Sequence, residues 1–134
     1  MIVPVTGVFA AVIGLLLLVL SAQVVRFRLK FGKGLGVNDD LDFQAAVRAH
    51  ANLVEYAPLG LLMLAIAEVN GVASGLVYWT GMALVVGRIL HAWGMIKGRG
   101  GPHKARMVGI LLTWLAILAA ALLLLGNVWQ VYSR

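Results

Sequence analysis

Four long stretches of apolar residues, separated by short polar segments, run through the chain. Crossing a bilayer as a helix takes about 20 mostly apolar residues, because each residue adds about 1.5 Å to a hydrocarbon depth of about 30 Å. Each stretch is long enough to do so. The pattern predicts one domain, residues 1–134, with four transmembrane helices at about 2–25, 43–69, 73–96 and 105–131.

The composition supports a chain embedded in lipid. Hydrophobic residues make up 62% of it and charged residues 12%, whereas soluble domains have about 45–50% and about 25%. A soluble core of this size would leave too much apolar surface uncovered. Disorder, fibrous repeats and an ordinary soluble fold are therefore excluded, and we expect an all-α membrane protein, a bundle of four transmembrane helices.

The chain has no cysteine. It therefore has no disulfide framework, no thiolate metal site and no thiol nucleophile of its own. Any sulfur chemistry would need a ligand that brings the sulfur. No other group of residues has the spacing of a metal site, so we expect none.

The basic residues, which outnumber the acidic ones to give a net charge of +6, gather in two of the three loops. The loop between the second and third spans has no lysine or arginine. By the positive-inside rule, the first and third loops face the cytoplasm and both termini lie outside. This topology accounts for the basic charge, and without a binding fold or interleaved aromatic residues we expect no nucleic-acid partner.

Polar side chains concentrate in the second span, in the segment RAHANLVEY that begins at Arg48. An ionisable group at membrane depth costs at least about 2.5–3.5 kcal/mol on insertion scales. Asn52, Glu55 and Tyr56 follow Arg48 by four, seven and eight residues, so the four side chains share one helix face. His50 lies off this face. A cation, an amide, a carboxylate and a phenol together can bind a zwitterionic ligand.

Glu55 needs a positive partner or a proton at this depth. Arg88 of the third span lies at a comparable depth, and we expect it to pair with Glu55 between the helices. His91, three residues further on, lies on the same face as Arg88. These polar groups either line a binding site or only bond neighbouring helices to one another.

The pattern Arg48-x-x-x-Asn52-x-x-Glu55-Tyr56 on the second of four spans resembles the signature of the MAPEG superfamily, the membrane-associated proteins in eicosanoid and glutathione metabolism. The resemblance is strongest to short bacterial members. It extends over essentially the whole chain, with a polar first loop and Gly87-Arg88-x-x-His91 on the third span. It implies a homotrimer of four-helix subunits that holds glutathione between neighbouring subunits, facing the cytoplasm.

The resemblance also implies a role for individual residues. An arginine near the start of the fourth helix stabilises the glutathione thiolate in the family, and here Lys104 or Arg106 is the candidate. A nearby cation lowers the pKa of a thiol, which fits this role. The glutathione-binding positions correspond to residues of the first three helices: Arg26, Arg48, His50, Asn52, Glu55, Tyr56, Arg88 and His91.

The expected function is therefore that of a glutathione transferase or peroxidase in a bacterial inner membrane, joining cytosolic glutathione to an apolar small molecule from the lipid bilayer. Two alternatives stay open. The polar face could belong to a non-catalytic membrane scaffold, or Glu55 could carry protons in a small proton-coupled transporter.

Overall fold

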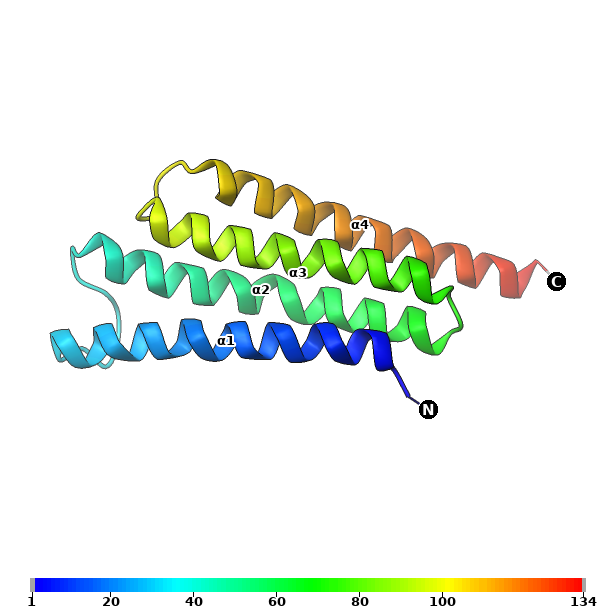
Figure 1. Cartoon of the computed structure of the whole chain (residues 1–134), viewed down its shortest axis with the longest axis horizontal. Helices are drawn as coiled ribbons and strands as arrows, with labels where there is room; N and C mark the ends of the chain where they lie inside the picture. Colours follow the sequence, from blue (N-terminus) through cyan, green and yellow to red (C-terminus); the bar gives the residue numbers. More distant parts are fainter. Residues whose placement is uncertain (1, 134) are drawn as a thin grey trace.

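A computed structural model describes residues 2–133 of the chain, apart from the side chain of Val131. Met1 and Arg134, the ends of the expected domain, lie outside the described residues. The described part contains four long helices, and each is long and apolar enough to cross a membrane. The predicted fold class is therefore confirmed. The helices are α1 (Pro4–Phe31), α2 (Leu41–Val69), α3 (Ser74–Lys97) and α4 (Lys104–Tyr132) (Figure 1).

Helix α1 continues past residue 25, where its apolar run ends, as far as Phe31. Arginine and lysine are good helix formers, and their long side chains reach water from the end of a span. Phe27 and Phe31 stack on Phe43 of α2, with ring centroids 5.6 and 5.8 Å apart. The helix stops at Gly32, whose φ of +61° suits glycine. The first loop is thus shorter than hydropathy alone predicts.

The helices lie side by side, with α2 and α3 in the middle of the bundle (Figure 1). Helix α1 packs on α2 and α3, α4 packs on α3 and α2, and α1 does not contact α4 within the described residues. Loop one (residues 32–40) and loop three (residues 98–103) lie at one end of the bundle. Loop two (residues 70–73) and both chain ends lie at the other (Figure 1). The two basic loops therefore share one end.

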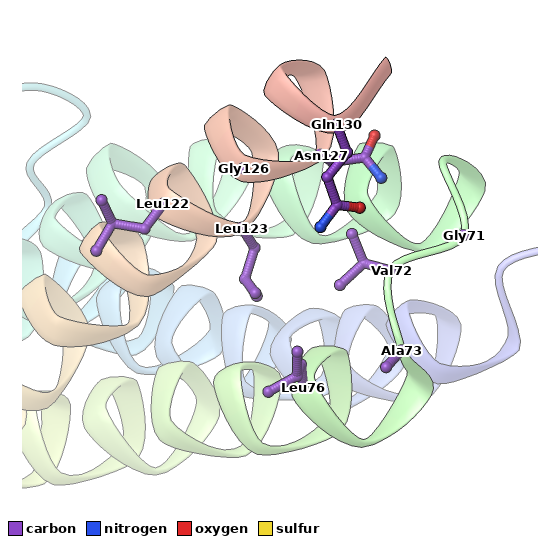
Figure 2. Close-up of a pocket in the computed structure, with 9 residues that line it drawn as sticks. All are labelled: Gly71, Val72, Ala73, Leu76, Leu122, Leu123, Gly126, Asn127 and Gln130. Atoms are coloured by element: carbon purple, nitrogen blue, oxygen red, sulfur yellow. The ribbon is translucent and has the colours of Figure 1, made fainter. Parts of the chain in front are cut away.

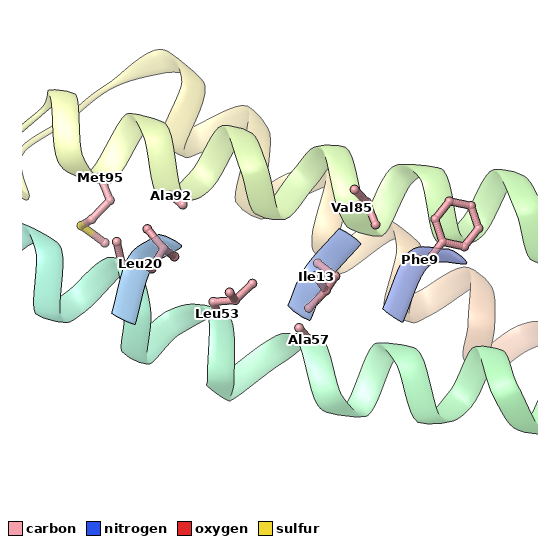
Figure 3. Packing of buried hydrophobic residues seen from close by; sticks show 9 residues of the cluster. Phe9, Ile13, Leu20, Leu53, Ala57, Val85, Ala92 and Met95 are labelled. Carbon is pink, nitrogen blue, oxygen red and sulfur yellow. The ribbon is translucent and has the colours of Figure 1, made fainter. Parts of the chain in front are cut away.

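An apolar core joins the first three helices (Figure 3). Ile13 of α1 lies between Ala57 of α2 and Val85 of α3, and the ring of Phe9 lies against α3 (Figure 3). Many large apolar side chains instead face outward, such as Leu125, which is 67% exposed. Lipid tails are as apolar as leucine, so the core holds the helices together through close packing, and the outer residues suit contact with lipid.

Glycines let α3 and α4 approach closely. A Cβ atom on Gly87 would lie 2.9 Å from the carbonyl oxygen of Gly109. A Cβ on Gly109 would overlap the backbone nitrogen of His91, and one on Gly94 would overlap that of Arg106. Small residues at an interface are typical of helix packing in membranes. This close approach fixes the position of the α4 side chains that face α2 and α3.

A carboxylate from α2 caps the first turn of α1. The backbone N–H groups of Val5 and Thr6 donate to the two oxygens of Glu68, at 2.9 and 2.8 Å. The residue before this helix, Val3, provides no side-chain cap. A negative charge at a helix N-terminus stabilises the unpaired N–H groups there. Glu68 therefore holds the N-terminal end of α1 against α2.

We predict that Glu68→Gln lowers the stability of the detergent-solubilised chain by about 1–2 kcal/mol. The amide keeps one acceptor oxygen and loses the charge that strengthens both hydrogen bonds. Thermal unfolding followed by circular dichroism measures the change. Asp39→Asn removes one exposed acidic charge from loop one and serves as the control. Equal midpoints for the two variants would contradict the capping role.

Candidate functional site

The four polar residues of α2 lie along one helix face, as their spacing predicts, but the partner of Glu55 differs from the prediction. Nη1 of Arg48 lies 3.5 Å from Oε1 of Glu55, and the side chains are 57% and 49% exposed. Nδ2 of Asn52 lies 3.5 Å from the other oxygen of Glu55. The predicted Glu55–Arg88 pair is wrong, because Glu55 lies on the outward side of α2 whereas Arg88 is enclosed in the bundle.

Arg88 is 1% exposed and joins three helices. Its Nε donates to Oγ1 of Thr113 on α4, and its Nη1 donates to Oδ1 of Asn52 on α2, both at 2.8 Å. The guanidinium lies over the ring of Tyr56, 5.1 Å from the centroid. Its Nη2 has no hydrogen-bond partner among the described residues. A buried cation whose partners are all neutral leaves a net positive charge inside the bundle.

A pocket of about 410 Å³ opens beside this network, between α2, α3, α4 and loop three. Four of the predicted site residues line it: Asn52, Tyr56, His91 and Arg106. The remaining lining residues come from loop three and α4: Pro102, His103, Met107 and Ile110. The sequence thus predicted four residues on three different helices that the fold brings together at one pocket.

Arg106 and Lys104, the two candidates at the start of α4, differ in position. Nη1 of Arg106 donates to the carbonyl oxygens of Gly100 and Gly101, at 2.6 and 3.3 Å, and this side chain lines the pocket. Lys104 is exposed and is not among the lining residues. The geometry therefore favours Arg106 as the cation that faces a ligand.

A second, apolar pocket of about 510 Å³ shares Tyr56 and also reaches Glu55. Its other lining residues are apolar: Leu59, Trp114, Ile117, Leu118 and Ala121. Three of them are more than half exposed in the chain: Leu59 at 53%, Trp114 at 53% and Leu118 at 56%. Tyr56 therefore lies where a polar pocket meets an apolar one that opens to the outside of the bundle.

Five of the predicted binding residues do not line this pocket: Arg26, Arg48, His50, Glu55 and Arg88. Arg26 lines a separate hollow of about 340 Å³ at the end of α1, together with Gln23, Phe27 and Lys30. His50 is half-buried on another side of α2, as its offset from the polar face predicts. Within one chain, neither Arg26 nor His50 lines the pocket that contains Arg106.

Sequence reasoning missed Thr113, which accepts the Arg88 hydrogen bond, and His103, which lines the pocket. Thr113 follows Arg106 by seven residues and so lies on the same helix face, a signal that the helical period carries. His103 caps α4, its Nδ1 accepting from the N–H of Ala105 at 3.2 Å. Its ring lies edge-on to Trp93, a contact between loop three and α3.

The opposite end of the bundle has a hollow of about 330 Å³ between loop two, α3 and α4 (Figure 2). Apolar side chains such as Leu76 and Leu123 line it, with the amides of Asn127 and Gln130 at one edge (Figure 2). No lining residue is charged. This hollow lacks a cation such as Arg106 of the pocket near loop three. Among the described residues, no group of three or more histidine or acidic side chains is placed to hold a metal ion.

Comparisons with known proteins match one family profile and two relatives. A profile of the MAPEG family matches residues 6–126. The inner membrane protein YecN of Escherichia coli strain K12 is 32% identical over 125 residues, which cover 93% of this chain and 91% of that protein. The protein of the same name from E. coli O6:H1, strain CFT073, matches to the same extent. The name of these relatives gives a location and no activity.

Proposed function

This chain belongs to the MAPEG family of membrane proteins, and from that premise we propose that it is a glutathione-dependent enzyme of transferase or peroxidase type. It would join glutathione from the cytoplasm to an apolar electrophile from the bilayer. The name of its E. coli relatives supports an inner-membrane location. The basic loops one and three support the assignment of that end of the bundle to the cytoplasm.

The observation that carries the proposal is the junction of two unlike pockets at Tyr56. One pocket has Arg106, His91, Asn52 and His103 around it and opens near the basic loop three. The other is apolar and faces outward. A polar co-substrate could reach Tyr56 from the cytoplasm and an apolar acceptor could reach it from the bilayer. The polar molecule would then not have to enter lipid, nor the apolar one water. Such an arrangement suits conjugation at a membrane surface.

The residues present fit glutathione. A pocket of about 410 Å³ falls in the usual range of about 300–1,000 Å³ for small-molecule sites. The tripeptide carries two carboxylates and one amine, and the exposed guanidinium of Arg48, next to Glu55, suits a carboxylate. The carboxylate of Glu55, close to Asn52, suits the amine. When bound, glutathione supplies the thiol nucleophile.

Each side chain then has a distinct task. Arg106 would hold the sulfur as thiolate, because a nearby cation favours the deprotonated form of a thiol. Asn52, fixed by Arg88, would orient the tripeptide backbone through its amide. Tyr56, held under the Arg88 guanidinium, would place its phenol between the two reactants. The apolar side chains around Trp114 would exclude water from the acceptor.

A homotrimer would complete this site. Arg48 and Glu55 are about half exposed on a helix that crosses the membrane. Lipid is a poor medium for such a pair, whereas a neighbouring subunit could bury it and add polar partners. The same neighbour could bring its own Arg26, which one chain alone leaves away from the pocket.

The Arg88 network also favours a second candidate function, that of a non-catalytic scaffold. Arg88 bonds Asn52 and Thr113, so part of the predicted binding face is occupied by contacts within the chain. Interhelical hydrogen bonds of this kind average only about 0.6 kcal/mol in membranes. That is little compensation for burying a guanidinium, so the scaffold explains the burial of Arg88 less well than a ligand does.

Titration of the detergent-solubilised protein with glutathione tests the proposal. We expect saturable heat, and about 10- to 100-fold weaker binding for Arg88→Met, because Asn52 in the pocket lining loses the charge-assisted hydrogen bond that orients it, a bond that contributes about 1.5–3 kcal/mol. Methionine fills a similar volume without the charge. Lys97→Met, an exposed cation on the same helix, is the control.

The outcomes separate the two candidate functions. If millimolar glutathione produces no heat and no thermal shift, the proposed enzyme function is rejected. If Arg88→Met folds and binds glutathione as the wild type does, Arg88 is a structural residue and the scaffold interpretation gains.

A further inference from the structure

Loop three is tied to the start of α2 by an ion pair outside the pocket. Nε and Nη2 of Arg99 donate to the two carboxylate oxygens of Asp42, at 2.7 and 2.8 Å. The Asp42 carboxylate raises the pKa of Arg99 through these hydrogen bonds. Parallel hydrogen bonds of this kind fix direction as well as distance. The pair, whose side chains are 62% and 45% exposed, therefore connects loop three to the start of α2.

The backbone at this point is held in an uncommon conformation. Arg99 has a φ of +49°, in the left-handed region that side chains other than glycine rarely adopt, and Gly100 follows with +80°. Such a conformation persists where surrounding contacts hold it. Hydrogen bonds from the N–H groups of Arg99 and Gly100 to the end of α3 hold it from one side. Asp42 holds it from the other.

The same loop shapes the pocket in two ways. Pro102 and His103 form part of its lining. The carbonyl oxygens of Gly100 and Gly101 accept hydrogen bonds from Nη1 of Arg106. The conformation of loop three therefore sets the direction of the Arg106 guanidinium, and any shift of the loop changes that direction.

We propose that Asp42 and Arg99 are positioning residues for Arg106. Their ion pair holds loop three in the conformation in which the carbonyls of Gly100 and Gly101 orient the guanidinium at the pocket. Neither residue lines the pocket, so both act through the loop. The catalytic consequence rests on the proposed function, whereas the positioning of Arg106 does not.

The first experiment needs no glutathione. In Asp42→Asn, we expect amide hydrogen exchange at residues 99–101 and labelling of Arg106 by phenylglyoxal to become about fivefold faster, each followed by mass spectrometry. The effect should be of this modest size because the two side chains are 62% and 45% exposed, and exposed ion pairs contribute little. Asp39→Asn removes an equal charge from the same region and should change neither rate.

The second experiment measures the consequence for chemistry. The pH at which glutathione conjugation reaches half its maximal rate should rise in Asp42→Asn, because a displaced Arg106 stabilises the thiolate less well. Asp42→Glu keeps a carboxylate and should restore most of the wild-type profile. A general loss of stability would lower the amount of active protein without moving this pH.

Each outcome decides the proposal. Wild-type exchange and labelling rates in Asp42→Asn would overturn it. If the chain binds glutathione and Arg106 is labelled faster, but the pH profile does not change, then the proposed positioning role in catalysis is also overturned. If the wild-type chain binds no glutathione, the proposed function fails, and the labelling rate of Arg106 alone then decides whether Asp42 positions that side chain.

Discussion

Arg106→Ala is expected to slow glutathione conjugation to an apolar aryl halide by about 10- to 30-fold at neutral pH, because a thiol with a pKa of about 8.5 is only about 3% thiolate at pH 7. Arg106 is the arginine among the pocket-lining residues. Its Nη1 is already used by two loop carbonyls, and Nε and Nη2 have no hydrogen bond among the described residues. These two donors are available to a thiolate.

The pH dependence should change in a direction that identifies the role. A free thiol has a pKa of about 8.5, and a nearby cation lowers it. The wild-type rate should therefore reach its plateau below that pH. In Arg106→Ala the midpoint should rise toward about 8.5, so that the loss in rate is largest at low pH and shrinks as the pH rises. Stopped-flow assays across this range measure the profile.

Lys104→Ala is the companion measurement. Lys104 is exposed and lies outside the pocket lining, so we expect a much smaller effect on rate and no change in the pH midpoint. A comparable loss in Lys104→Ala with little loss in Arg106→Ala would transfer the role to Lys104. Equal small losses in both would remove thiolate stabilisation by α4 from the proposed mechanism.

Hydropathy alone was enough to predict the fold. Four apolar stretches of sufficient length leave few alternatives, because only helices satisfy their backbone hydrogen bonds within a single segment in lipid. The end of α1 was harder to predict. Phe31 extends the helix because its ring stacks on Phe43, a contact between residues on different helices that no local pattern contains.

The residues that line the candidate pocket were predicted in part, and the hydrogen-bond partners of the polar residues less well. The spacing of Asn52 and Tyr56 placed them on one face, and the fold turns that face toward Arg106. The partner of Arg88 was mistaken because depth in the membrane does not fix rotation about the helix axis. Glu55 and Arg88 lie at comparable depths, yet the side chain of Asn52 is the one that reaches the guanidinium.

Gly109→Ala is the second variant for which we expect a large effect, a loss of both stability and activity. The added methyl group would overlap backbone atoms of His91 and lie too close to the carbonyl oxygen of Gly87, so α4 must move away from α3. Overpacking of this kind costs about 1–3 kcal/mol, or roughly 10 °C in the unfolding midpoint for a chain of this size. Thermal unfolding in detergent measures it.

Gly94→Ala tests the same contact nearer the site, because its methyl group would overlap the backbone of Arg106. Conjugation by this variant should fall further than its loss of stability explains, since Arg106 itself must shift. Gly126→Ala is the control: it lies in α4 with no atom within 4 Å of the added carbon, and alanine is the better helix former. Wild-type stability in Gly109→Ala would mean that α3 and α4 are not packed this closely in the membrane, and the position of Arg106 would then lose its structural basis.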